Sequence, residues 1–177
     1  CDRNELDIVG LNRHVGTLCR DAGAFIEADK WLLATAKDFP GIKRVDFGGG
    51  CGLPYKKYEG EERLPLDERS ERFTALLQSW TAEAGFDGQF IIEPGRYISA
   101  ECSILLGTAH ATKNNGPTRY VGTDLGFNVL ARPIMYDSFH DVEVYPHDGQ
   151  ARTGPMQTLV GHICDRGDLL AQARLLP

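Results

Sequence analysis

The feature that most constrains this chain is a run of three glycines, Gly48-Gly49-Gly50, at the end of a strand-like segment. Residues 42–47 alternate apolar and polar side chains, as a half-buried strand does. Glycine loses more conformational freedom on folding than any other residue, so such a run indicates a backbone that turns sharply or approaches a ligand closely. Free N–H groups there can hold a phosphate. The alternative interpretation is a flexible turn.

Two further strand-like segments also end in polar residues. Residues 89–92 lead into Glu93-Pro94-Gly95-Arg96, and residues 8–14 end at His14, with Thr17 close behind. Segments with helical spacing lie between the three strands. Strands that alternate with helices and carry polar residues at their carboxyl ends are typical of the active-site loops of a (β/α)₈ barrel.

The spacing of apolar residues predicts two helices in this first part of the chain. One lies near residues 24–38 and the other begins at residue 66. We expect their packed faces to contain Phe25, Leu32, Leu33 and Ala36 in the first helix, and Phe73, Leu76, Leu77, Trp80 and Ala84 in the second.

Helical periodicity is lost after Arg96. Residues 97–107 are predicted to be extended, residues 113–117 form a strong turn signal, and strands are expected at 119–123 and 158–161. The sequence therefore predicts a barrel-like domain over residues 1–97 and a separate antiparallel β domain over residues 98–177.

Composition excludes several classes of function. Hydrophobic residues make up 42% of the chain and charged residues 25%, which is typical of a globular protein. A net charge of −6 argues against nucleic acid as a partner, and no apolar run is long enough to span a membrane. The five cysteines are scattered without metal-ligand spacing, so we expect no metal site and a reducing, cytoplasmic location.

Six segments, taken in chain order, resemble the signatures of the fold-type III pyridoxal-phosphate decarboxylases, and most closely those of the diaminopimelate decarboxylases. Each segment alone is a weak signal, but six in order with sensible spacing are a strong one. The segments are His14-Val15-Gly16-Thr17, Gly48-Gly49-Gly50, Glu93-Pro94-Gly95-Arg96, Asp124-Leu125-Gly126-Phe127-Asn128, Arg132-Pro133-Ile134-Met135-Tyr136 and Cys164-Asp165-Arg166-Gly167-Asp168.

The resemblance implies a fold class, α/β, in which the C-terminal part of a (β/α)₈ barrel is followed by the start of an antiparallel, Greek-key-like β domain. A complete barrel needs far more than 97 residues, so we interpret the chain as part of a longer protein. The cofactor-bearing lysine of the family lies on an early barrel strand, which we expect to be absent here. The chain alone is therefore predicted to be inactive.

The resemblance also implies a site for pyridoxal 5′-phosphate. Gly48, Gly49, Gly50 and Gly95 would supply N–H groups to the phosphate, and the Thr17 hydroxyl would add a hydrogen bond, unless Thr17 caps a helix.

Three further residues complete the expected cofactor site. Arg96 would bind the phosphate or a substrate carboxylate, although it could instead form a surface ion pair. Glu93, expected to be buried after Ile91-Ile92, would keep the pyridine nitrogen protonated. His14 would stack on the ring. Family members usually have another histidine two residues earlier, where this chain has Asn12.

Substrate residues are implied in the second part of the chain. Arg132 and Tyr136 match a motif whose arginine binds the distal carboxylate of diaminopimelate. Cys164 and Asp165 match a pair that acts in the partner subunit's site of a homodimer, the cysteine in reprotonation and the acid on the distal amine. Diaminopimelate enzymes usually carry Glu where this chain has Asp165, which is closer to the ornithine-type pattern.

The function that these residues favour is decarboxylation of an amino acid, meso-diaminopimelate to lysine. A decarboxylase of ornithine, lysine or a polyamine precursor is the first alternative, and a non-catalytic fragment is the second. An alanine-racemase-like activity would share the barrel but would not explain Arg132-Pro133 or Cys164-Asp165.

Overall fold

The computed structural model describes residues 5–145 and 154–176. The chain forms two compact units, residues 1–103 and residues 104–177. Both units contain helices and strands, so the mixed α/β class predicted from the sequence is confirmed.

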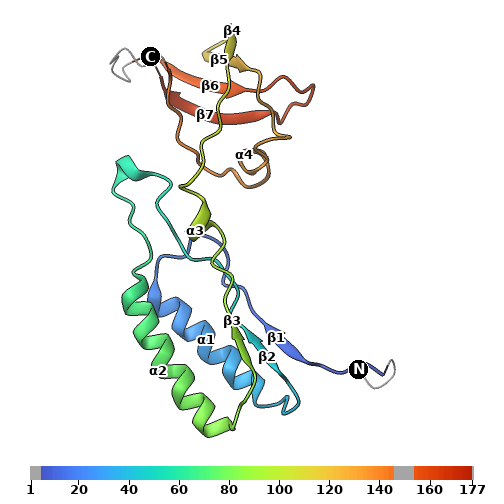
Figure 1. Ribbon diagram of the computed structural model, residues 1–177. Coiled ribbons are helices and arrows are strands. Elements are labelled where there is room, and N and C mark those ends of the chain that lie inside the picture. Colours follow the sequence, from blue (N-terminus) through green and yellow to red (C-terminus); the bar gives the residue numbers. More distant parts are fainter. Residues whose placement is uncertain (1–4, 146–153, 177) are drawn as a thin grey trace. The chain divides into compact units, whose positions relative to one another are not determined.

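The first unit is built on a three-stranded parallel sheet in the order β1-β2-β3 (Figure 1). The strands are β1 (Gly10–Asn12), β2 (Arg44–Asp46) and β3 (Gln89–Ile91). Helix α1 (Ala22–Ala36) connects β1 to β2, and helix α2 (Leu66–Ala84) connects β2 to β3. Parallel neighbours require such long crossovers, and each helix returns the chain so that all three strands end at the same edge of the sheet.

Helix α1 begins where Asp21 accepts hydrogen bonds from two backbone N–H groups, those of Gly23 and Ala24, at 2.7 and 3.3 Å. This side-chain cap satisfies donors that have no partner within the helix. The predicted packed face is confirmed, because all four of its residues are buried: Phe25, Leu32, Leu33 and Ala36.

Helix α2 packs beside α1 through Trp80, whose indole N–H donates to the Leu33 carbonyl at 3.1 Å. Phe73 meets Phe47 edge to face, with ring centroids 4.8 Å apart. The predicted face of α2 is confirmed except at Ala84, which is exposed at the last turn of the helix.

A buried ion pair joins the end of β1 to α1. Arg13 donates to Asp29, whose side chain has no exposed surface. Within the described part of the chain, Arg13 Nε and Nη1 and Asp29 Oδ2 have no hydrogen-bond partner. Burial raises the pKa of the Asp29 carboxyl, and the hydrogen bond and charge of Arg13 oppose that rise. A raised pKa indicates that desolvation of this carboxylate outweighs its pairing.

Between β3 and the second unit, residues 96–99 form a single helical turn, α3 (Arg96–Ser99), rather than the start of the predicted extended segment. Gly95 enters this turn with φ +41°, a conformation that favours glycine. Ser99 Oγ donates back to the Gly95 carbonyl at 3.3 Å, which stabilises the turn.

The second unit contains a four-stranded sheet in the order β4-β5-β6-β7. Its strands are β4 (Ala109–Asn115), β5 (Thr118–Thr123), β6 (Met156–Val160) and β7 (Leu169–Leu175). The turn predicted at residues 113–117 is confirmed as the hairpin between β4 and β5. Leu170 and Ala171 on β7 are buried.

One pairing in this sheet differs from the antiparallel arrangement predicted from the sequence. β4 pairs with β5, and β6 with β7, in antiparallel fashion, whereas β5 and β6 are parallel. A parallel pair cannot be joined by a tight hairpin, so the chain takes a long connection that includes α4 (Arg132–Tyr136). The sheet is therefore mixed.

The buried ion pair gives a stability prediction. Asp29→Ala should lower the free energy of unfolding by about 3–5 kcal/mol, because it leaves the Arg13 charge buried and unpaired. The double variant Arg13→Leu/Asp29→Leu should lose much less free energy of unfolding, because both desolvated charges are removed together. Urea unfolding of a protein that contains this chain measures both effects, with the exposed Asp38→Ala as control. A double variant as unstable as Asp29→Ala would contradict this account.

Candidate functional site

The glycine run lies where the carboxyl ends of the three parallel strands meet. Gly48 and Gly50 have φ of +60° and +97°, which favour glycine. A side chain at any of the three positions would also collide with a carbonyl oxygen of another segment. These carbonyls belong to Arg13 for Gly48, Glu93 for Gly49 and Gly16 for Gly50. The glycines therefore allow the backbones that follow the three strands to pack in direct contact.

The N–H groups of the glycine run differ in availability. Gly48 N–H donates to Asp46 Oδ1 at 2.8 Å, which closes a tight turn after β2. The N–H groups of Gly49 and Gly50 donate to no acceptor in the described part of the chain. Unpaired N–H groups in a turn can bind an anion. Two backbone donors are therefore free to hold one here.

Arg96 connects the segments that follow all three strands. Its Nη1 donates to the Tyr55 hydroxyl at 3.1 Å, and its Nη2 donates to Thr17 Oγ1. No carboxylate pairs with Arg96 among the residues that the structure describes, so the surface ion pair considered from the sequence is not formed there. The guanidinium keeps its charge available for an anionic ligand.

Thr17 does not cap a helix, because Asp21 takes that role for α1. Its hydroxyl oxygen accepts from Arg96, and a hydroxyl that accepts one bond can still donate another. Arg96 thus fixes the position of the hydroxyl and leaves its proton for a ligand.

Glu61, which the sequence did not single out, holds the loop that carries Tyr55. Its Oε2 accepts the backbone N–H groups of Tyr55 and Lys56, both at 3.0 Å, and its Oε1 accepts from Arg20 at 3.3 Å. The hydrogen bond from the Lys56 backbone is the main reason that the pKa of Glu61 lies below its ordinary value. The loop should therefore loosen as the pH falls through that lowered pKa.

Glu93 and His14 lie at the same edge of the sheet. Glu93 N–H donates to the Gly48 carbonyl at 2.9 Å, and the His14 imidazole lies against Gly48. Both side chains are exposed, and neither forms a hydrogen bond or ion pair within residues 5–145 and 154–176. The predicted burial of Glu93 is wrong for this chain, because β3 is an edge strand and Ile92 beside it is 51% exposed.

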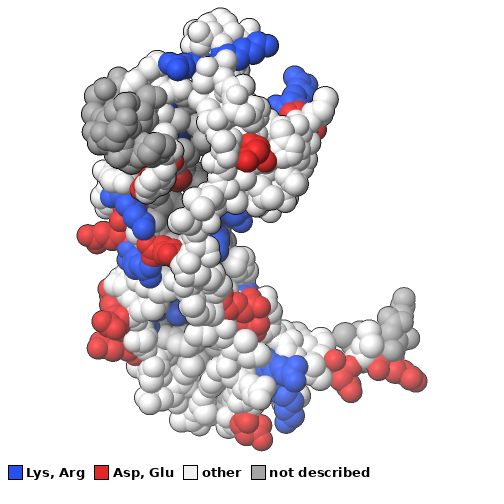
Figure 2. All heavy atoms as spheres, turned by 45° about the horizontal axis from the view of Figure 1, so that its top comes forward, with Lys and Arg blue, Asp and Glu red and all other residues white. Residues whose placement is uncertain are grey.

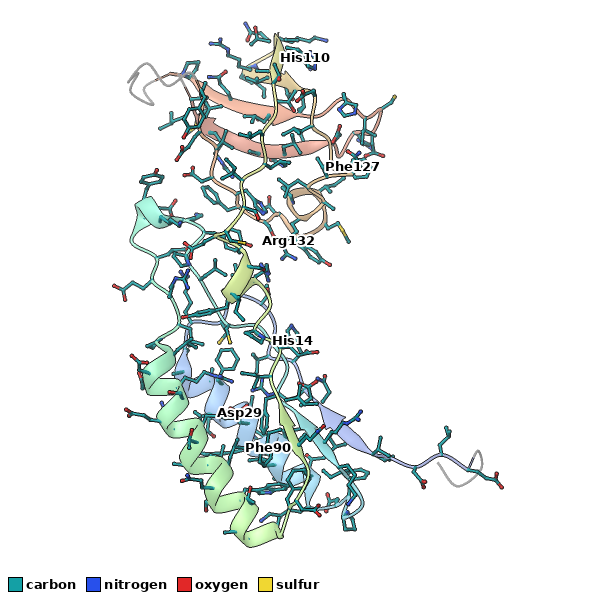
Figure 3. The ribbon with its side chains drawn as sticks, in the orientation of Figure 1. His14, Asp29, Phe90, His110, Phe127 and Arg132 are labelled. Atoms are coloured by element: carbon teal, nitrogen blue, oxygen red, sulfur yellow. The ribbon has the colours of Figure 1, made fainter. Side chains whose placement is uncertain are left out.

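The second unit holds the other predicted site residues. Arg132 lies in the first turn of α4 (Figure 3). Its guanidinium is 4.9 Å from the centroid of the Tyr136 ring. Its Nε is buried without a hydrogen-bond partner, and no acidic side chain pairs with it in the described part of the unit. A half-buried, unpaired arginine beside an aromatic ring is suited to a carboxylate ligand.

Cys164 and Asp165 are exposed on a loop that Asp168 fixes. The buried Asp168 carboxylate accepts the N–H groups of Phe127 and Ile163, both at 2.7 Å. It therefore joins the loop between β6 and β7 to the segment before α4. Asp168 belongs to a motif noted in the sequence, but its positioning role becomes visible only from these contacts.

Charge on the molecular surface is mixed in sign. Figure 2 shows basic and acidic side chains interspersed on the visible face. Ion pairs in the first unit include that of Lys57 with Glu101 at 2.7 Å. Within the described residues, no group of three or more His, Cys, Asp or Glu could hold a metal ion, and no helix has the length and hydropathy needed to cross a membrane.

Comparison with known proteins identifies relatives over almost the whole chain. A diaminopimelate decarboxylase from Methanothermobacter thermautotrophicus is 34% identical over 96% of this chain and 40% of its own length. The enzyme of the same name from Archaeoglobus fulgidus has the same identity and coverage. The chain thus spans about 40% of the length of these curated relatives.

Solved structures agree with the sequence relatives. The crystal structure of Helicobacter pylori diaminopimelate decarboxylase complexed with L-lysine superposes with a TM-score of 0.72 at 29% identity, covering 97% of this chain and 41% of that one. Residues 28–177 match the family described as pyridoxal-dependent decarboxylase, C-terminal sheet domain. Because this match covers most of the chain, the chain belongs to the pyridoxal-dependent decarboxylase family.

Proposed function

We propose that this chain is part of a pyridoxal-phosphate-dependent carboxy-lyase that converts meso-diaminopimelate to lysine in lysine biosynthesis. One observation carries the proposal: three kinds of anion-binding group gather where three parallel strands end. They are the Arg96 guanidinium, the Thr17 hydroxyl and the Gly49 and Gly50 N–H groups; among the described residues the first has no carboxylate partner and the last two have no acceptor. The similarity to diaminopimelate decarboxylases over 96% of the chain supports the assignment.

The first unit fits the phosphate end of the cofactor. Gly49 and Gly50 offer N–H groups, Gly95 lies at the start of α3, and Arg96 offers positive charge. Thr17 adds a hydroxyl proton. Gly48 supports these donors by closing the turn, because its own N–H is bonded to Asp46.

The ring of the cofactor would lie near Glu93 and His14. When bound, pyridoxal phosphate supplies a protonated pyridine ring that accepts the electron pair released as the carboxylate leaves. The Glu93 carboxylate would hold the proton on the ring nitrogen, and it is free of any other partner in the described part of the chain. His14 would contact the face of the ring.

The second unit fits the substrate. Arg132, whose guanidinium lies 4.9 Å from the centroid of the Tyr136 ring, would bind the distal carboxylate. Asp165 would hold the distal amine, and Cys164 would return a proton to the substrate carbon after carbon dioxide has left. Both residues are exposed, as a pair that serves the partner subunit of a homodimer would be.

We further propose how these units belong to a longer protein. Residues 1–97 would be the C-terminal part of a (β/α)₈ barrel, and residues 98–177 the start of a Greek-key-like β domain that carries substrate and dimer-interface residues. The two consecutive βαβ units of the first part, β1-α1-β2 and β2-α2-β3, support this arrangement. The lysine that bears the cofactor would lie upstream, and the complete enzyme would be a cytoplasmic homodimer.

A decarboxylase of ornithine or lysine is the second candidate. Asp165 favours it, because diaminopimelate enzymes usually have Glu at this position. Arg132 favours diaminopimelate, because ornithine and lysine lack the distal carboxylate that would pair with its guanidinium. The two candidates therefore differ in whether Arg132 binds a carboxylate of the substrate.

Glu93→Ala, made in the full-length protein, should reduce decarboxylase activity by roughly 10²-fold or more, the lower end of the range for a positioned proton-transfer group. Its melting temperature should stay unchanged because the side chain is exposed. Activity, thermal unfolding and the visible absorption band of bound cofactor are the measurements. Glu62→Ala, another exposed loop glutamate, is the control. Full activity of Glu93→Ala would exclude the proposed role.

Arg132→Ala should reduce kcat/KM for diaminopimelate by an amount equivalent to about 2–5 kcal/mol, because the distal carboxylate would be left buried without its partner. It should scarcely affect turnover of lysine or ornithine. Steady-state kinetics with the three substrates test this, and Arg119→Ala on β5 is the matched control. Equal losses for all three substrates would show that Arg132 does not recognise the distal carboxylate, and diaminopimelate would then rest on resemblance alone.

A further inference from the structure

Two of the cysteines that are scattered in the sequence are direct neighbours in the first unit. Cys19 and Cys51 are partners in a parallel β-bridge between the segments that follow β1 and β2. Two hydrogen bonds hold this bridge: Cys19 N–H donates to the Gly50 carbonyl at 2.9 Å, and Gly52 N–H donates to the Cys19 carbonyl at 2.8 Å. The backbone thus fixes the register of the two cysteines.

The two side chains lie on the same side of the bridge. Both pack against one buried cluster, formed by Ala22, Phe25 and Leu64. Both are free thiols and both are half-buried, so each keeps some contact with solvent. Chains paired in this way lie about 4.8 Å apart, which is within the range of Cα separations that disulfides span.

We propose that Cys19 and Cys51 form a reversible intrachain disulfide when the protein meets a peroxide. The bond would join the segment that carries Thr17 to the residue that follows the glycine run. Cys19 Sγ lies 3.7 Å from the Asp21 carbonyl oxygen, and this weak contact would be replaced by the bond to Cys51. The bridge already holds the two backbones in register.

The chemistry balances with hydrogen peroxide as oxidant. One cysteine, as thiolate, attacks a peroxide oxygen, the O–O bond breaks, and a sulfenic acid and hydroxide are formed. The hydroxide takes up the proton that the thiol had released and becomes water. The second thiolate then attacks the sulfenic sulfur, the S–S bond forms, and hydroxide leaves and is protonated to water. In sum, two thiols lose two electrons and two protons, and the peroxide is reduced to two waters. A dithiol reductant reverses the change by exchange.

The test is to oxidise the full-length protein with one equivalent of hydrogen peroxide, block the remaining thiols with N-ethylmaleimide and digest with trypsin without reductant. Trypsin should release residues 14–20 joined to residues 45–56, because Arg13, Arg20, Arg44 and Lys56 bound these peptides. Mass spectrometry should find this pair before, but not after, treatment with dithiothreitol. The masses of the tryptic peptides report the disulfide directly, and this measurement does not depend on the proposed enzymatic activity.

Matched variants make the result specific. Cys102→Ser removes an exposed thiol of the same unit and should leave the joined peptides unchanged, whereas Cys19→Ser and Cys51→Ser should each abolish them. Oxidation in guanidinium chloride should form the pair about tenfold more slowly or worse, because the fold no longer holds the thiols together. The proposal is overturned if both cysteines are recovered separately, alkylated or as sulfinic acids, after the peroxide is consumed. It is also overturned if Cys19 couples to Cys102 as readily as to Cys51.

Discussion

The candidate site depends on the close approach of three backbones at the carboxyl edge of β1–β3. Gly48, Gly49 and Gly50 each lie against a carbonyl oxygen from a neighbouring segment, in contacts that any side chain would block. This single constraint explains why three residues without side chains occur in succession. It also places Thr17, Arg96 and the free N–H groups at one edge. The close packing of the loops and the binding of a ligand therefore both require glycine at these positions.

Polar side chains then hold each loop in place. Arg96 joins Thr17 to Tyr55 in the first unit, and in the second unit Asp168 joins the Cys164-Asp165 loop to the segment before α4. Each of these groups satisfies donors or acceptors that loops would otherwise leave unpaired. Glu93 and Cys164, proposed to touch cofactor and substrate, have exposed side chains. Asp168 holds the loop of Cys164, and the Glu93 backbone N–H donates to the Gly48 carbonyl.

The features that were predictable from the sequence are those marked by periodic apolar spacing or by turn-forming residues. Helices α1 and α2 followed from their apolar spacing, and the β4–β5 hairpin followed from its turn residues. The parallel β5–β6 pairing was missed because a long connection carries no local signal of strand direction. Glu61 was missed because its hydrogen bonds to the Tyr55 and Lys56 backbone depend on how the loop folds. The Cys19–Cys51 bridge was missed because its two residues are distant in sequence.

The central claim is that the glycine run and Arg96 hold the phosphate of pyridoxal phosphate. The most direct measurement is the amide NMR spectrum of the full-length protein, labelled with ¹⁵N at glycine, as pyridoxal phosphate is added. The account predicts large shifts for Gly49 and Gly50, whose N–H groups are free, and a smaller one for Gly48, whose N–H is bonded to Asp46. Unchanged Gly49 and Gly50 signals at saturation with the cofactor would contradict it.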